Sequence, residues 1–307
     1  MPADRRRRPR EILVTGGAGF IGSSLALECQ RLWPSARITV LDDFRSGDFH
    51  NLEGFQGDVV AAAAHEYRGG PRFDTVFHLA SLTDTTVHDQ LAMVRDNVEG
   101  FRRILEIARE SRARVVYASS AAVYGQASAR MDEEMTPKPA NVYAFSKAVL
   151  DNLGRRAAAD GLRVTGVRYF NVYGPREQHK KAAASMIYQL FLQMKAGKRP
   201  RIFRPGEQTR DFVHVNDVVA GTLLAAAKGA NTVYNLGSGK ARSFNEVIRI
   251  LNQAMGTKLV PDYFENPYGF YQEFTEADLT RSRRELGYRP AYPLEVGIPD
   301  YLKALGA

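Results

Sequence analysis

Tyr143 and Lys147 have the residue types and the spacing of an acid–base pair. They stand four positions apart in residues 142–158, a run that predicts a helix, so their side chains should lie one turn apart on the same face. A neighbouring ammonium favours a phenolate, and we therefore expect Lys147 to lower the pKa of Tyr143 and to make it a general base. Two surface side chains could share this spacing, so the elements around the pair must decide.

A glycine-rich turn near the start of the chain contains Gly16, Gly19 and Gly22. It follows an apolar run at 12–15 and precedes a helical run at 24–32. This order of strand, turn and helix is what a dinucleotide-binding unit requires, because glycines let the backbone approach a pyrophosphate at a helix N-terminus. The turn and its flanks together predict a dinucleotide-binding site.

Two acids, Asp42 and Asp43, end the apolar run at 38–41. A carboxylate at this place can accept hydrogen bonds from an adenosine ribose and would repel the 2′-phosphate of NADP, which favours NAD. Arg45 is the counterargument, since its guanidinium could pair with that phosphate. The sequence therefore predicts NAD by a small margin, with NADP as the alternative.

Apolar runs without polar alternation follow one another along the first half of the chain, separated by helical runs. Such runs predict parallel strands buried on both faces, and their alternation with helices predicts an α/β fold with a doubly wound parallel sheet of the Rossmann type. The predicted strands are 12–15, 38–41, 75–79, 115–119 and 164–168, and the predicted helices are 24–32, 97–109 and 142–158. Ligands bind at the carboxyl ends of such strands, where the serine pair 119–120 lies, which favours the acid–base interpretation.

The character of the chain changes after about Asn171, where glycine, proline and aromatic residues become frequent. We predict a basic tail at 1–10, a dinucleotide-binding domain at 11–171 and a smaller mixed α/β substrate lobe at 172–307. Parts of 212–250 are expected to return to the Rossmann domain.

Composition limits the possible classes of protein. The chain has 307 residues, 44% of them apolar and 25% charged, as in an ordinary globular protein. Its one cysteine, Cys29, excludes a disulfide framework and favours a cytoplasmic setting, and no apolar run has the length of a membrane span. The net charge of +8 owes much to the arginines of the tail, which argues against specific nucleic-acid binding and leaves a modest attraction for anionic small molecules. The six histidines are dispersed without ligand spacing, so no metal site is predicted.

Three motifs together resemble those of the extended short-chain dehydrogenase/reductases, whose members modify nucleotide sugars. They are the glycine turn, Ser120 ahead of residues 123–125, and the Tyr143–Lys147 pair. The resemblance covers nearly the whole chain. Within that family, the Arg-Glu-Gln-His-Lys sequence at 176–180 resembles the ADP-L-glycero-D-manno-heptose 6-epimerases. Further matches to those epimerases lie at 210–213, 235–239 and 271–279.

The resemblance implies an epimerase that transfers a hydride from a sugar carbon to a bound nicotinamide and returns it to the opposite face. Each epimer presents its hydroxyl differently, so two acid–base groups are expected, and these fall on Tyr143 and Lys180. Ser120 would hydrogen-bond the reacting oxygen, and Lys147 would hold the ribose and tune Tyr143. Lys180 could instead only orient a diphosphate.

Further site residues follow from the motifs and the resemblance. Asp58 is expected to follow a third short strand on the adenine side, and the fixed guanidinium of Arg210 suits a diphosphate. The predicted cofactor-binding residues are Gly16, Gly19, Phe20, Ile21, Gly22, Asp42, Asp43, Asp58, Ala80, Ser81, Leu82, Asn97, Tyr143, Lys147 and Val172. The predicted substrate contacts are Asn171, Phe203, Arg210 and Tyr271.

Departures from the heptose epimerase pattern keep alternatives open. Residues that those enzymes usually carry are replaced in this chain by Ala182, Gln189 and Phe49. A UDP-sugar 4-epimerase is therefore the second candidate. A nucleotide-sugar 4,6-dehydratase would need an Asp-Glu pair where this chain has Ala121 and Ala122. A non-catalytic dinucleotide-binding or RNA-associated relative is the candidate from another class. The resemblance also implies a homo-oligomer.

Overall fold

Seven parallel strands form the large sheet of the protein, in the order β10-β6-β5-β4-β1-β2-β3. The structure is a computed structural model that describes residues 9–83, 89–127, 129–267 and 272–306. The strands of this sheet are β1 (Glu11–Thr15), β2 (Arg37–Asp42), β3 (Asp58–Ala61), β4 (Thr75–His78), β5 (Arg114–Ser120), β6 (Val164–Tyr169) and β10 (Val233–Leu236). The predicted doubly wound parallel sheet is confirmed, and each predicted strand overlaps an observed one.

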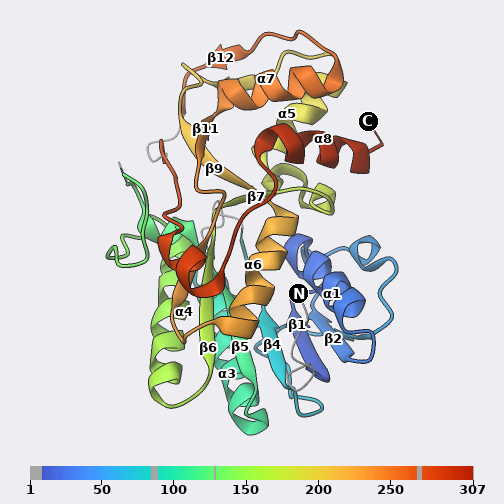
Figure 1. The fold of residues 1–307 in the computed structure, drawn as a ribbon, viewed down its shortest axis with the longest axis vertical. Helices are drawn as coiled ribbons and strands as arrows, with labels where there is room; N and C mark the ends of the chain where they lie inside the picture. Colours follow the sequence, from blue (N-terminus) through green and yellow to red (C-terminus); the bar gives the residue numbers. More distant parts are fainter. Residues whose placement is uncertain (1–8, 84–88, 128, 268–271, 307) are drawn as a thin grey trace.

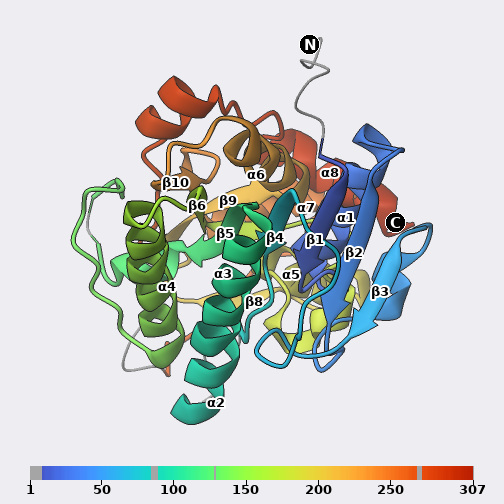
Figure 2. The ribbon, with the colours of Figure 1, turned by 90° about the horizontal axis from the view of Figure 1, so that it is seen from below.

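Helices cover both faces of this sheet (Figures 1 and 2). Successive residues of a strand point to opposite faces, so Ile12 and Val14 of β1 belong to one core cluster and Leu13 to another. The first cluster contains apolar residues of α1 (Phe20–Leu32) and α6 (Val215–Lys228). The second contains those of α3 (Gly100–Ser111) and α4 (Val142–Ala159).

A smaller lobe stands above the carboxyl ends of the large sheet (Figure 1). Its three-stranded sheet has the order β11-β9-β7, and β12 pairs with β8 in a separate two-stranded sheet. The elements of the lobe are β7 (Asn171–Tyr173), α5 (Met186–Lys195), β8 (Arg201–Phe203), β9 (Thr209–His214), β11 (Ala241–Ser243), α7 (Phe244–Met255), β12 (Asp262–Phe264) and α8 (Leu294–Ala304). The chain returns from this lobe to the large sheet through α6 and β10.

Two elements differ from the predicted helices. α1 begins at Phe20, directly after the glycine turn, rather than at residue 24. The helix expected at 97–109 is preceded by the short α2 (Gln90–Val94) and opens as a π-helix at Arg95–Glu99 before α3. Among the described residues, no helix combines the length and the hydropathy that a membrane crossing requires.

A buried ion pair anchors α4 to the large sheet. The guanidinium of Arg168 on β6 donates to Asp151 of α4, with Nη2 at 2.9 Å from Oδ2, and both side chains are almost completely buried. Tyr117 of β5 donates to the other carboxylate oxygen, and Arg168 also donates to the hydroxyl of Tyr124. The charges are therefore paired and hydrogen-bonded, which is the condition under which a protein core tolerates them. Because Lys147 lies one turn before Asp151, the pair also fixes the part of α4 that carries the predicted acid–base residues.

We expect Asp151→Ala to lower the free energy of unfolding by about 3 to 5 kcal/mol, because the substitution leaves Arg168 buried without its carboxylate. Denaturant unfolding followed by circular dichroism measures this loss. Asp160→Ala is the matched control, since Asp160 forms an exposed pair with Arg109 at 3.4 Å and should change stability little. Similar losses for the two variants would contradict the anchoring role.

Candidate active site

The glycine turn forms a cradle with no room for side chains. Gly16 has a φ of +68°, and a Cβ on it would lie 2.6 Å from the backbone nitrogen of Ala80. A Cβ on Gly22 would clash with the carbonyl oxygen of Gly16. Gly19 is the N-cap of α1 and offers no side-chain cap, so the first N–H groups of the helix are left for another acceptor. This cradle fits the pyrophosphate of a dinucleotide cofactor.

A cavity of about 1050 Å³ extends from the glycine turn along the carboxyl ends of the large sheet into the smaller lobe. Its size suits a dinucleotide and a second ligand together. The predicted residues that line it on the Rossmann side are Gly16, Gly19, Phe20, Ile21, Gly22, Asp42, Asp43, Ala80, Ser81, Leu82, Ser120, Tyr143 and Lys147. Those on the side of the lobe are Asn171, Val172, Lys180, Phe203 and Arg210.

Of the predicted site residues that the structure describes, Asp58 and Asn97 are not among those that line the cavity. Asp58 begins β3 instead of following it, so it stands at the edge of the sheet away from the site, and its expected place is wrong. Asn97 is fully buried and works through a neighbour: its side chain accepts from the backbone N–H of Leu82 at 2.7 Å and donates to Ser146 at 2.9 Å. Tyr271 lies outside the described residues.

The predicted acid–base pair faces the cavity from α4. The ammonium of Lys147 lies 5.7 Å from the ring centroid of Tyr143 and donates to the carbonyl oxygen of Ala118 at 2.8 Å. The side chain of Ser120, at the end of β5, favours the charged form of the Tyr143 phenol, and both residues line the cavity. The tyrosine and the serine can therefore both reach one oxygen atom of a ligand in this part of the cavity.

The pKa of Tyr143 shifts in the direction opposite to the one expected. Burial raises the pKa of its phenol, and the hydrogen bond with Ser120 opposes this only in part. Burial also lowers the pKa of Lys147 to about 8, while Asp151 opposes that shift. Both changes have one cause, because a site withdrawn from water disfavours every charged form. The expectation that Lys147 lowers the pKa of Tyr143 is therefore wrong.

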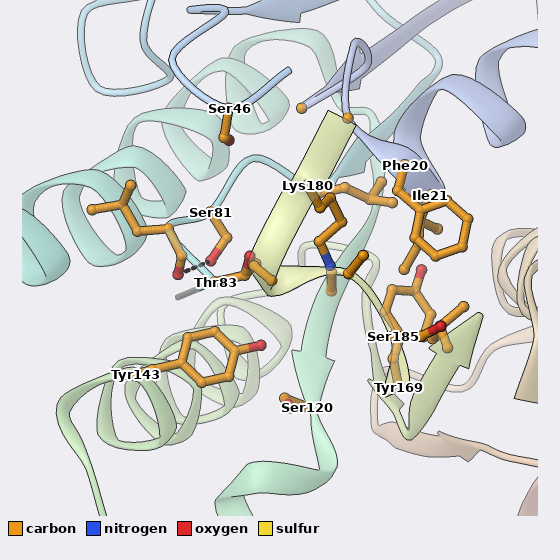
Figure 3. A pocket seen from close by; sticks show the side chains of 18 of the residues that line it. Phe20, Ile21, Ser46, Ser81, Thr83, Ser120, Tyr143, Tyr169, Lys180 and Ser185 are labelled. Atoms are coloured by element: carbon orange, nitrogen blue, oxygen red, sulfur yellow. Dashed lines mark hydrogen bonds between the residues drawn. The ribbon is translucent and has the colours of Figure 1, made fainter. Parts of the chain in front are cut away.

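Lys180 reaches the cavity from the opposite wall. It belongs to a 3₁₀ helix at Gln178–Ala183 in the smaller lobe, and its ammonium points into the space that Tyr143 and Ser120 also face (Figure 3). The ammonium lies 5.9 Å from the ring centroid of Phe20. Burial lowers the pKa of Lys180, although Glu177 favours its charged form. A lysine with a lowered pKa can exchange a proton more readily at neutral pH.

Glu177 holds the loop that carries Lys180. Its side chain is completely buried and accepts hydrogen bonds from the backbone N–H of Gly174 and from the N–H and hydroxyl of Ser185. The residues on both sides of the 3₁₀ helix are thus tied to one carboxylate. Because Glu177 holds the chain on both sides of this helix, the direction in which Lys180 points is fixed.

The end of the cavity next to β2 is acidic, as predicted, but its carboxylates are already engaged. Asp42 accepts from the backbone N–H of Ala18 and of Phe44, each at 2.9 Å. Since a carboxylate oxygen has two lone pairs, Asp42 can still accept from a ribose hydroxyl. Asp43 instead pairs with Arg45, whose Nε lies 2.7 Å from Oδ2.

Several lining residues were not predicted from the sequence. The segment 62–65, which follows β3, lines the cavity where Asp58 was expected to contribute. Arg201 and Phe264 come together because β8 pairs with β12, and the ring of Phe264 lies 4.9 Å from that of Phe203. Because segment 62–65 follows a strand, its position could have identified it as part of the site. No local pattern in the sequence predicts the pairing of β8 with β12.

The described residues contain no cluster of three or more His, Cys, Asp or Glu side chains that could hold a metal ion.

A glycine cradle at the end of a parallel sheet, with a Tyr-x-x-x-Lys pair beside a serine, defines an extended short-chain dehydrogenase/reductase.

Comparison with known proteins gives the particular family. The model of the NAD dependent epimerase/dehydratase family matches residues 12–237, and the chain belongs to this family. The ADP-L-glycero-D-manno-heptose-6-epimerase of Alkalilimnicola ehrlichii is 35% identical to it over 316 residues, which cover 96% of this chain and 97% of that protein. The predicted membership of the extended short-chain dehydrogenase/reductases and the resemblance to heptose epimerases are confirmed.

Two solved structures extend the comparison. The crystal structure of ADP-L-glycero-D-manno-heptose-6-epimerase from Helicobacter pylori is 41% identical, with a TM-score of 0.90 and coverage of 98% of this chain and 97% of the other. UDP-glucuronic acid 4-epimerase from Bacillus cereus, in complex with UDP-glucuronic acid and NAD, is 25% identical, with a TM-score of 0.84 and coverage of 96% and 100%.

We expect Tyr143→Phe to reduce turnover by ~10² to 10⁴, because it removes only the oxygen that exchanges a proton with the ligand. Steady-state turnover measures the loss, and the fold and the bound cofactor should be retained. Tyr263→Phe is the control: it removes a hydroxyl that bonds Asn245 outside the cavity. Near-normal turnover of Tyr143→Phe would rule out its role as the acid–base group.

Proposed function

We propose that the protein epimerises the sugar of an ADP-glycero-manno-heptose at carbon 6, acting on a nucleoside diphosphate sugar with a nicotinamide cofactor. The observation that carries this proposal is the meeting of Tyr143 and Lys180 in one cavity from opposite walls (Figure 3). An enzyme that transfers a hydride at only one face of a sugar carbon needs a single proton-exchanging group. Two such groups, on two sides of one space, suit a ligand that reacts in two orientations.

The named relatives support the same reaction class. Both the Alkalilimnicola and the Helicobacter proteins are heptose epimerases, and each matches nearly the whole chain. The Bacillus cereus structure is a 4-epimerase that holds a UDP-sugar, which keeps a UDP-sugar 4-epimerase as the second candidate. The higher identity to the heptose enzymes favours the first.

Each residue of the site has a role that its geometry allows. Tyr143 exchanges a proton with a sugar hydroxyl through its phenolic oxygen, and Ser120 hydrogen-bonds the same oxygen of the sugar. Lys147 donates a hydrogen bond to the carbonyl of Ala118, which keeps its cationic group close to Tyr143 and Ser120. When bound, a nicotinamide cofactor supplies a reversible hydride acceptor. Lys180 exchanges the proton when the sugar lies in its other orientation.

The walls on the lobe side suit a nucleoside diphosphate. Arg210 is almost completely buried and lines the cavity, where a fixed guanidinium can bind phosphate oxygens. Phe203 and Phe264 form an aromatic wall against which a nucleobase can stack. Asn171 lines the cavity between these residues and the acid–base group.

We further propose that the cofactor is NAD, since Asp42 retains acceptor capacity for a ribose hydroxyl and would repel a 2′-phosphate. The NAD in the Bacillus cereus structure is consistent with this choice. Homo-oligomerisation, cytoplasmic location and the domain boundaries at residues 10 and 171 stay predictions.

A panel of nucleotide sugars tests the proposed substrate. We expect the purified protein to interconvert the two carbon-6 epimers of ADP-glycero-manno-heptose faster than it epimerises UDP-glucose or UDP-glucuronic acid at carbon 4, with products separated by chromatography and identified by NMR. Preferred turnover of a UDP-sugar would favour the second candidate. The absence of turnover with every sugar would favour a non-catalytic dinucleotide-binding relative.

Lys180→Met tests the second acid–base group. We expect it to reduce net epimerisation by ~10² to 10⁴ while hydride transfer from one of the two epimers persists, because Tyr143 still serves that orientation. Single-turnover reduction of the cofactor, measured from each epimer separately, gives the two rates. Lys198→Met is the control, since it removes an exposed ammonium of the same lobe that is not among the residues lining the cavity. Equal losses from both epimers with a raised substrate dissociation constant would instead assign Lys180 to diphosphate binding.

A further inference from the structure

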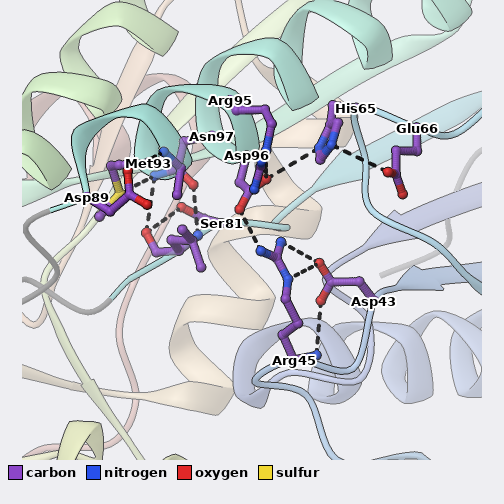
Figure 4. Close-up of polar contacts among 12 residues, drawn as sticks. Asp43, Arg45, His65, Glu66, Ser81, Asp89, Met93, Arg95, Asp96 and Asn97 are labelled. Atoms are coloured by element: carbon purple, nitrogen blue, oxygen red, sulfur yellow. Dashed lines mark hydrogen bonds and ion pairs between the residues drawn. The ribbon is translucent and has the colours of Figure 1, made fainter.

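A chain of ion pairs links Asp43, Arg45 and Asp96 beside the carboxyl end of β2 (Figure 4). Arg45, in the loop after β2, places Nε 2.7 Å from Oδ2 of Asp43 and Nη1 2.7 Å from Oδ2 of Asp96. Its guanidinium is thus held between two carboxylates that are far apart in sequence. Arg45, Asp43 and Asp96 all line the cavity.

Asp96 is the fixed end of this chain. Its side chain is only 5% exposed, whereas that of Arg45 is 48% exposed. Arg95 donates to the other oxygen of Asp96 at 3.1 Å, and Nδ1 of His65 lies 3.4 Å from that same oxygen. Although burial opposes this, the hydrogen bonds from Arg45 and Arg95 hold the pKa of Asp96 below its usual range. Asp96 is therefore charged at neutral pH and binds Arg45 as a carboxylate.

The π-helix at Arg95–Glu99 explains why Asp96 can reach the loop after β2. Asp96 points to Arg45, while the next residue, Asn97, holds the backbone of Leu82 in the loop after β4. One helical segment thus fixes two of the loops that border the cavity. An arginine held in this way is part of the wall and has few donors left for a ligand.

The local charges disfavour a further anion. Three carboxylates, those of Asp42, Asp43 and Asp96, stand beside the guanidinium groups of Arg45 and Arg95. A 2′-phosphate brings about −1.5 to −2 charges and needs donors that are not already paired. To bind it, Arg45 would have to leave a carboxylate, and that carboxylate would then repel the phosphate.

We infer that Asp96 is a positioning residue that sets the choice between NAD and NADP: it holds Arg45 against Asp43 and so withholds the guanidinium from a 2′-phosphate. The inference rests on the proposed nicotinamide cofactor and is independent of the sugar. Breaking the Asp96 contact turns Arg45 from a paired wall residue into a phosphate-binding one.

The test compares dissociation constants of NAD and NADP for the full-length protein freed of bound nucleotide, measured by calorimetry. In the wild type, NAD binds more tightly. We expect Asp96→Asn to lower the ratio of the NADP to the NAD dissociation constant by about tenfold, since one charge next to the phosphate is removed. Glu66→Gln is the matched control: it removes an exposed carboxylate 3.9 Å from His65 that does not touch Arg45, and the ratio should stay unchanged.

A double variant separates the released arginine from a general loss of negative charge. Arg45→Met alone should not tighten the binding of NADP, because it leaves Asp43 and Asp96 without their cation, whereas Arg45→Met combined with Asp96→Asn should cancel the gain. A gain that persists without Arg45 would overturn the inference, and so would an unchanged ratio in Asp96→Asn. If Asp96→Asn does not fold by circular dichroism, Asp43→Asn releases the same guanidinium from the second carboxylate that holds it, with the same expected shift and the same overturning result.

Failure of the cofactor proposal would look different. A wild-type protein that prefers NADP, and that releases mainly NADP on denaturation as measured by mass spectrometry, would contradict both the NAD proposal and the inference. An unchanged ratio in Asp96→Asn with tight NAD binding would contradict the inference alone. Epimerisation of the nucleotide-sugar panel is judged separately from either result.

Discussion

The parallel direction of the seven strands is the constraint on which the site depends. Because the strands run the same way, their carboxyl ends meet at one edge, and the loops that follow them must share that edge. The crowding there is severe enough that Gly16 approaches the backbone of Ala80 at a distance no side chain could occupy. The same close approach leaves backbone N–H groups at the start of α1 for a phosphate. The cradle is thus a product of the strand arrangement as much as of the glycines.

The two walls of the cavity are supported by separate buried carboxylates. On the Rossmann side, Asp151 pairs with Arg168 and fixes the turn of α4 that follows Lys147. On the side of the lobe, Glu177 gathers the ends of the loop that carries Lys180. Neither carboxylate touches the cavity. The proposed active site takes its two acid–base groups from two lobes and requires this kind of support, because a small rotation of either wall would separate them.

The sequence predicts the parts of the site that local patterns specify. The strands, the glycine turn and the spacing of Tyr143 and Lys147 depend on neighbours within a few residues, and the structure has all of them. Asp58 was misplaced because the start of a four-residue strand cannot be told from its end by composition. The contact of Arg45 with Asp96 joins positions 51 residues apart, and no periodicity marks it. Tertiary contacts of this kind become visible only when the fold is known.

Burial also explains why spacing alone misjudged the electrostatics of the site. The pKa of Tyr143 is raised while those of Lys147 and Lys180 are lowered, so each shift moves its group toward the neutral form. An isolated pair would show only the attraction of the ammonium for the phenolate, but here the loss of water outweighs it. A dianionic diphosphate would reverse part of this effect, because it favours the charged forms of both lysines. We therefore expect the charge of the proposed substrate to be coupled to proton exchange, because its diphosphate would help to set the protonation of the lysines that face the cavity.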